Sequence, residues 1–169
     1  MLMENIFLMG AEISRPKNLS TKNYLLFYPT EGYHITEVQH SLFVKHLEAL
    51  NLLENVSGMD IEFMSAGVKT NADELRKVAG FSYQDYKDTQ LIFENCIFDE
   101  KLRWTICVYQ DYWGIVYGEN ELIRRLSADY DFEQDAQRFE SELIAEIMDE
   151  KSRREYETLI KLSYVRVKQ

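Results

Sequence analysis

Three segments rich in β-branched and aromatic residues follow one another closely in the middle of the chain, at 90–98, 102–109 and 113–118. Residues of these types are enriched in β-strands because their side chains fit a pleated, partly buried surface. Strands that are close in sequence usually lie side by side, so the simplest arrangement is an antiparallel meander. This feature constrains the fold most, since every other element has to pack around the sheet.

The last two of these strands form the hairpin TICVYQDYWGIVYG at 105–118. Successive side chains of a strand point to opposite faces, which places Ile106 and Val108 on one face and Cys107 and Tyr109 on the other. Both faces are apolar, as in central strands that are covered on two sides. The hairpin is therefore predicted to build the core, with only its connection in solvent. The predicted tip, a candidate contact for a partner, consists of Asp111, Tyr112 and Trp113.

Weaker strand signals lie on the N-terminal side of the meander. Residues 5–9 and 23–28 resemble short strands, and 60–66 alternates apolar and polar side chains. Together with the meander, these strand candidates predict a sheet of about five strands. The polar and aromatic segment 81–89 is expected to be a loop.

Two helices are expected between these strands. The first runs from Thr36 to about Glu54, because Thr36 and Gln39 match a capping box and apolar residues follow at helical spacing. The second is short, with Asn71 as its N-terminal cap and Gly80 at its end.

The pattern changes to helical after the hairpin. A short apolar face covers 122–126, and Asp131 with Gln134 resembles the start of another helix, whose apolar face extends to 147. The stripe stops over 149–155, which either a turn near its start or an exposed helical bridge would explain. Alternation over 165–167 suggests a terminal edge strand.

These elements predict an α+β fold. The chain has 169 residues, of which 46% are hydrophobic, which suits one domain with its own core. We expect a single globular domain over 1–169. Its mostly antiparallel sheet of about five strands would carry helices packed on it, including the C-terminal helices.

The net charge of −10 is concentrated in one segment. Residues 119–150 hold eleven acidic and three basic side chains, whereas 151–169 holds six basic and two acidic ones. Part of this pattern is structural, because acids favour a helix N-terminus and the basic segment could fold back on the acidic one. The functional interpretation is a surface that attracts a basic protein partner, while direct binding to nucleic acid is disfavoured. The candidate contacts in this segment are Asp129, Asp131, Glu133, Asp135, Glu140 and Glu142.

Signatures of catalysis are weak. His34, His40 and His46 are spaced by six residues, so the last two would point about 120° apart on a helix and could not share a metal ion. The two cysteines lie in predicted strands, and neither a GxSxG elbow nor a glycine-rich phosphate loop occurs. We assign no catalytic residue, no metal and no cofactor.

The sequence gives no sign of a membrane segment. The N-terminal MLMENIFLMG lacks the basic region of a signal peptide, and no apolar run approaches the length of a membrane-spanning helix. We expect a cytoplasmic protein without a membrane partner.

The hairpin and the helix after it resemble a known kind of protein. Arg103–Ile106, Trp113–Gly118 and Glu121–Ile123 resemble strand–strand–helix segments in immunity proteins of bacterial contact-dependent or polymorphic toxin systems. The resemblance covers about 102–126. It implies a small, acidic cytoplasmic protein that binds and neutralises one cognate toxin, which is often a basic nuclease.

Three functions from different classes therefore remain. The leading hypothesis is an immunity-type inhibitor that covers a basic toxin with its acidic segment and exposed aromatic residues, as a monomer or a homodimer. The alternatives are a small enzyme whose site is assembled from scattered residues, and an oligomerisation or scaffold module.

Overall fold

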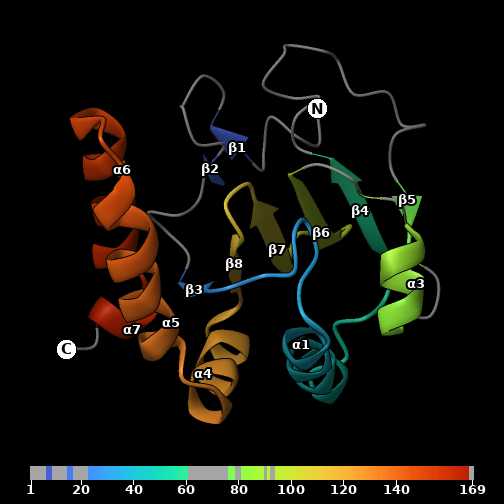
Figure 1. The fold of residues 1–169 in the computed structure, drawn as a ribbon. Helices are drawn as coiled ribbons and strands as arrows, with labels where there is room; N and C mark the ends of the chain where they lie inside the picture. Colours follow the sequence, from blue (N-terminus) through green and yellow to red (C-terminus); the bar gives the residue numbers. More distant parts are fainter. Residues whose placement is uncertain are drawn as a thin grey trace.

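A six-stranded antiparallel sheet forms the centre of the protein, with strand order β3-β8-β7-β6-β4-β5 (Figure 1). The computed structural model describes residues 7–8, 15–16, 23–60, 76–78, 81–89, 91 and 94–167. Helices lie against the sheet and dominate the C-terminal part of the chain. The predicted α+β class, with a mostly antiparallel sheet and C-terminal helices, is confirmed.

The meander predicted from the sequence forms the middle of this sheet. Strands β6 (Asn95–Asp99), β7 (Trp104–Tyr109) and β8 (Trp113–Gly118) pair in succession and antiparallel. The register places Cys107 opposite Cys96 on one side and Ile115 on the other. The meander lies in the middle of the sheet, because β3 pairs with it on one side and β4 on the other.

The outer strands come from the N-terminal half of the chain. Strand β3 (Tyr24–Phe27) pairs with β8, and β4 (Val56–Asp60) pairs with β6. Strand β5 (Arg76–Lys77) adds two residues at the edge, next to β4. A separate pair is formed by β1 (Phe7–Leu8) and β2 (Arg15–Pro16).

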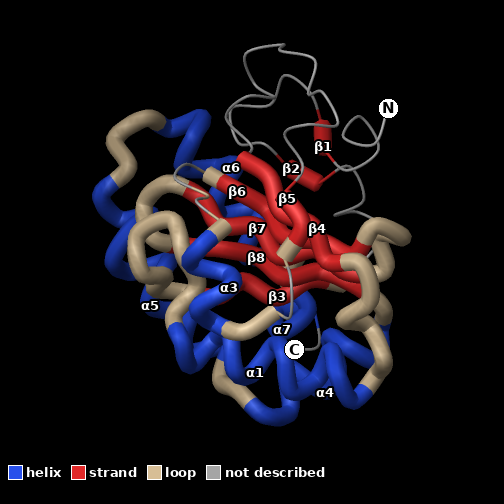
Figure 2. Tube along the Cα trace, turned by 90° about the vertical axis from the view of Figure 1, so that its right-hand side faces the viewer, coloured by secondary structure: helices blue, strands red, loops and turns tan. Residues whose placement is uncertain are grey.

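Both faces of the sheet are covered, as the alternation in the hairpin predicts. One face carries Cys107, Tyr109 and Ile115 and packs against the C-terminal helical segments. The other carries Ile106 and Val108 and packs against the helices α1 (Glu37–Ala49) and α4 (Asn120–Asp129). Figure 2 shows α1 and α4 below the strands. Burial of apolar surface on two faces is the main stabilising contribution of such a layered arrangement.

The first helix begins where the sequence predicts it. Helix α1 spans Glu37–Ala49, and the Thr36 side chain accepts a hydrogen bond from the backbone N–H of Gln39. The helix ends five residues earlier than Glu54, because the chain turns through a left-handed conformation at Asn51, whose φ is 55°.

The prediction of a loop over 81–89 is wrong, because the structure has helix α3 (Tyr83–Asp88) there. Ser82 caps this helix: its hydroxyl accepts a hydrogen bond from the N–H of Asp85, and the Asp85 carboxylate accepts from the Ser82 N–H. Tyr86 is fully buried and anchors the helix to the core. The reciprocal cap and one buried ring stabilise a helix of only six residues.

The C-terminal helical segments follow the predicted order, but not the predicted end. Helix α4 spans Asn120–Asp129 and α5 spans Phe132–Arg138, which continues as a π-helical turn over Phe139–Leu143. Helix α6 (Glu150–Lys161) begins as a separate helix, with Asp149 as its N-terminal cap. Of the two alternatives that the sequence left open, the turn is therefore confirmed and the continuous helical bridge is wrong. The predicted terminal edge strand is wrong, because Tyr164–Val167 forms a helical turn, α7, which packs against the face of the sheet that carries Ile106 and Val108.

Two other expected elements lie largely outside the described residues. Of the strand expected at 60–66, the structure describes only Asp60, which ends β4. Of the helix expected from Asn71 to Gly80, it describes 76–78, of which Arg76–Lys77 is strand β5.

Candidate functional site

The hairpin tip has an unusual backbone conformation. Its loop, residues 110–112, joins β7 to β8 between the paired residues Tyr109 and Trp113. Asp111 and Tyr112 both have positive φ values, 68° and 64°. The left-handed region disfavours side chains with a Cβ, and a bulky residue there is uncommon. The surrounding structure therefore has to hold the loop in this shape.

Two hydrogen bonds between the loop and residues outside it hold it in place. The backbone N–H of Thr30 donates to the carbonyl oxygen of Tyr112 at 2.7 Å. The backbone N–H of Gln110 donates to Oε1 of Glu94 at 2.9 Å. The tip is thus tied to the turn after β3 and to the residue before β6, and its Tyr112 ring remains 59% exposed.

A small cavity lies between the tip and the turn at 31–34. Its volume is about 240 Å³, and we call it the tip pocket. It is lined by Gly32, Tyr33, Tyr109, Gln110, Asp111 and Tyr112. Three tyrosines, one aspartate and one glutamine therefore line a space that is smaller than most small-molecule sites.

The charges around the tip are negative. The pKa of Tyr156, on α6, is raised to about 12, chiefly by burial and also by the carboxylates of Asp111, Glu94 and Glu155. Burial also raises the pKa of Tyr109, and Glu94 contributes in the same direction. The Gln110–Glu94 hydrogen bond and the contact of the Tyr156 ring with Trp113 place this negative charge beside the tip.

One predicted contact residue does not reach the surface. Trp113 is 1% exposed, so its assignment as a solvent-exposed contact is wrong. Its ring stacks on Tyr109 at 4.2 Å between ring centroids, and Phe139 and Tyr156 pack against it. Trp113 belongs to strand β8 and faces the same side as Ile115, which fixes the base of the tip to the C-terminal helices.

The prediction that Asp135 belongs to an acidic surface is also wrong, because this residue is only 5% exposed. One carboxylate oxygen accepts the backbone N–H of Tyr28 at 3.0 Å, and the other accepts the hydroxyl of Tyr130 at 3.3 Å. Burial raises its pKa to about 6, although both hydrogen bonds oppose that shift. Asp135 therefore ties α5 to the end of β3.

The exposed carboxylates of the acidic segment are mostly occupied by the chain itself. Asp129 contacts Lys45 at 2.5 Å and His46 at 3.1 Å, and Asp131 caps α5 through the N–H of Gln134. Glu142 pairs with Arg138, and Glu140 lies 3.6 Å from Arg166, so the basic C-terminal segment does fold back on the acidic one. Glu133 is half-buried on α5. The local charge is thus partly neutralised within the chain.

The residues between β3 and α1 connect these carboxylates with the tip. The guanidinium of Arg138 lies 5.6 Å from the centre of the Tyr28 ring, and the Tyr28 hydroxyl donates a hydrogen bond to the Glu142 carboxylate. Two residues later, Thr30 holds Tyr112, and Gly32 lines the tip pocket. Tyr28 and Thr30 therefore link Glu142 and the hairpin tip to the same stretch of chain after β3.

His34 and His40 both pack against the ring of Tyr86, whereas His46 lies elsewhere. His40 packs among the rings of Phe81, Tyr83 and Tyr86, whereas His46 contacts Asp129 on another part of α1. Burial lowers the pKa of His40. Within the part of the chain that the structure describes, no three His, Cys, Asp or Glu side chains are grouped for a metal ion.

The cysteines face each other across β6 and β7. Both thiols are fully buried, and burial raises the pKa of each. A buried thiol in apolar surroundings is a poor nucleophile, because the reactive form is the thiolate. Neither cysteine lines the tip pocket.

Comparison with known proteins gives no relative for this chain: no protein-family model, no curated protein and no solved structure matches it significantly. None of the helices among the described residues combines the length and the apolar character that crossing a bilayer demands.

Proposed function

We propose that the chain is an immunity-type inhibitor, which binds a cognate basic toxin in the cytoplasm and neutralises it. One observation carries the proposal: Tyr112 presents an exposed ring on a loop that is fixed in an unfavourable backbone conformation, beside Asp111 and the tip pocket. Such strain persists where the surrounding structure enforces it, and it is typical of functional sites.

The chemistry of the tip suits a protein partner. Tyrosine is enriched among the residues that dominate binding energy, because its large and rigid ring loses little entropy on binding. The hydrogen bonds from Thr30 and Gln110 fix the loop before binding, which lowers the cost of ordering it. The carboxylates around it add attraction for a basic surface and speed its approach.

The acidic segment contributes around this centre. Three exposed members, Asp129, Glu140 and Glu142, contact lysine, arginine or histidine side chains of the same chain, so the segment presents mixed charge with an acidic excess. The proposal therefore places Tyr112 and Asp111 at the centre of the interface and Glu140 and Glu142 at its rim. Rim charges mainly affect the association rate and its salt dependence.

Co-expression with the product of the adjoining gene tests this function. The expected result is a complex that co-purifies at low ionic strength, weakens as salt increases, and restores growth of cells that produce the toxin. Tyr112→Asn should weaken the complex at least tenfold, because asparagine tolerates a positive φ but removes the ring.

Val38→Asn is the matched control, since Val38 is 69% exposed on α1 and does not line the tip pocket. It should leave the complex unchanged. The absence of any complex at low salt would refute the proposed function.

A second candidate function, an oligomerisation module, is favoured by two apolar side chains in the C-terminal helical region. Met148 is 94% exposed and Leu162 is 54% exposed. Exposed methionine is common at binding surfaces because its flexible side chain adapts to a partner. Light scattering at increasing protein concentration tests this: a dimer that Met148→Glu dissociates would support oligomerisation, and a monomer throughout would contradict it.

A further inference from the structure

The tip pocket has the composition of a site for a cation. Tyr33, Tyr109 and Tyr112 are among the residues that line it, and the electron-rich face of an aromatic ring attracts cations. Asp111 adds a carboxylate and Gln110 adds a polar side chain at the same cavity. Aromatic walls together with a carboxylate match a cationic group and repel an anionic one.

Carboxylates beyond the lining strengthen this preference. Glu94 accepts the N–H of Gln110, so its charge lies directly beside the loop. Glu155 and Asp111 both act on Tyr156, which packs against Trp113 below the tip. A cation in the tip pocket would therefore lie in a negative potential that comes from several elements of the fold.

The size of the cavity limits the ligand. About 240 Å³ is less than the volume of typical cofactor and drug sites, roughly 300–1,000 Å³, and suits a single side chain. The planar guanidinium of arginine can stack on a tyrosine ring and donate two hydrogen bonds to one carboxylate. The ammonium of lysine offers a point charge without the stacking surface.

We propose that the tip pocket binds an arginine side chain of the protein partner, with lysine as a weaker ligand. The proposal rests on the proposed function, because that function supplies a basic protein as the source of the arginine. It assigns one named subsite within the interface: the guanidinium lies between Tyr33 and Tyr112 and pairs with Asp111.

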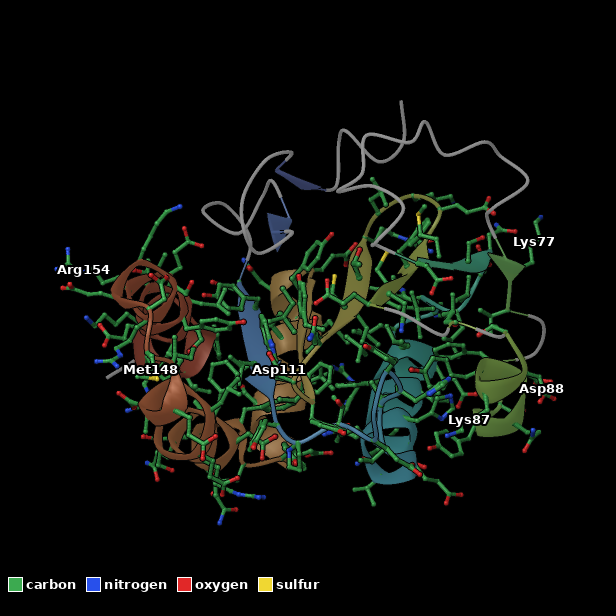
Figure 3. The ribbon with its side chains drawn as sticks, turned by 45° about the horizontal axis from the view of Figure 1, so that its top comes forward. Lys77, Lys87, Asp88, Asp111, Met148 and Arg154 are labelled. Atoms are coloured by element: carbon green, nitrogen blue, oxygen red, sulfur yellow. The ribbon has the colours of Figure 1, made fainter. Side chains whose placement is uncertain are left out.

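The loop is suited to this role before the partner arrives. The Thr30–Tyr112 and Gln110–Glu94 hydrogen bonds hold the backbone on both sides of Asp111. Figure 3 shows Asp111 in this loop, well apart from Lys87 and Asp88 of α3. Asp88 is therefore a suitable control for a change of charge at Asp111.

A titration with small probes tests the subsite without the partner. The probe is N-acetyl-arginine amide, and N-acetyl-citrulline amide is its neutral isostere. In ¹H–¹⁵N spectra, the arginine probe should cause saturable shifts of the Gly32, Gln110 and Tyr112 amides, with millimolar affinity. The citrulline probe should bind at least about tenfold more weakly, because it lacks the charge that the rings and the carboxylate attract.

Variants of the full chain test the assignment of residues. Asp111→Asn should lower the affinity for the arginine probe about fivefold, because it removes the charge of the accepting group. Asp88→Asn should leave that affinity unchanged. Equal binding of the arginine and citrulline probes, no saturable shift at these amides, or full affinity in Asp111→Asn would each overturn the proposal.

The same variants separate this proposal from the proposed function. If Asp111→Asn loses the arginine probe but binds the adjoining gene product with full affinity, the interface lies elsewhere and the subsite in it is wrong. If the native chain binds the arginine probe but no toxin, the immunity function is wrong and the chemistry of the pocket stands. Loss of both in Asp111→Asn supports both proposals.

Discussion

Asp135→Asn should change how the stability of the protein depends on pH. The pKa of this buried carboxyl is raised from its ordinary value of 3.8 to about 6, chiefly because burial disfavours the charged form. The folded state then binds the proton more tightly than the unfolded state. The stability that this group contributes is therefore fully present below pH 3.8 and is lost as the pH rises to about 6.

The size of this effect follows from the two pKa values. At about 1.4 kcal/mol per pH unit, the interval from 3.8 to about 6 corresponds to about 3 kcal/mol of unfolding free energy. Asparagine cannot ionise, so the variant avoids this loss. It can still accept the N–H of Tyr28, but its amide group faces the Tyr130 hydroxyl, which costs about 1 kcal/mol.

The two contributions have opposite signs, so the stability curves should cross. We expect the variant to be about 0.5 kcal/mol less stable at pH 4 and about 2 kcal/mol more stable at pH 7. Urea unfolding at a series of pH values measures the difference. The fluorescence of Trp104 and Trp113 reports it, because both are buried in the folded state.

The exposed carboxylate of Asp88 provides the control for this experiment. Asp88→Asn should shift the curve by less than about 0.5 kcal/mol, with little change between pH 4 and pH 7. If the Asp135→Asn and native curves run parallel across this range, the carboxyl does not carry the raised pKa, and the explanation is wrong.

Two further predictions concern the core of the sheet. Gly114→Ala should destabilise the protein by on the order of 3 kcal/mol, because the new Cβ would lie 2.2 Å from the Phe27 ring and 2.6 Å from the Cys107 carbonyl oxygen. Gly58→Ala, whose Cβ would meet a flexible methyl of Leu91 at 3.1 Å and the Cys96 carbonyl oxygen at an ordinary 3.6 Å, should cost less than about 1 kcal/mol. Equal urea midpoints for the two variants would contradict this reasoning. Cys96 and Cys107 should resist a thiol reagent in the native protein and both react in denaturant, so rapid labelling of the native chain would show that the sheet opens.

The hairpin was predictable because its signal is local. Two apolar faces with a period of two residues require a central strand, and the structure confirms which side chains share each face. The error at Trp113 came from extending the connection by one residue. The same alternation places Trp113 on the face of Ile115, so the sequence contained the information that corrects it.

Asp135 could also have been placed correctly. It lies three residues after Phe132 and four before Phe139, both of them buried, and residues at these spacings share one face of a helix. Charge alone suggested a surface residue, but helical position was the stronger signal. A carboxylate on the core face can be accommodated only because Tyr28 and Tyr130 supply hydrogen bonds to it.

The tip pocket, in contrast, could not be predicted. It depends on the turn at 31–34 meeting the loop at 110–112, and no periodicity relates two loops so far apart in the chain. The positive φ values at Asp111 and Tyr112 were equally hidden, because neither residue is glycine. Such features arise from tertiary contacts that local patterns do not encode.

The structure also changes what the acidic composition means for binding. A carboxylate that already pairs with an arginine of its own chain gains little from a second cation, because the first pair has to weaken as the new one forms. Glu142 with Arg138 and Glu140 with Arg166 are in this position. Asp111 lies instead at a cavity lined by tyrosines. Specific affinity should therefore depend more on the tip than on the segment with the highest charge density.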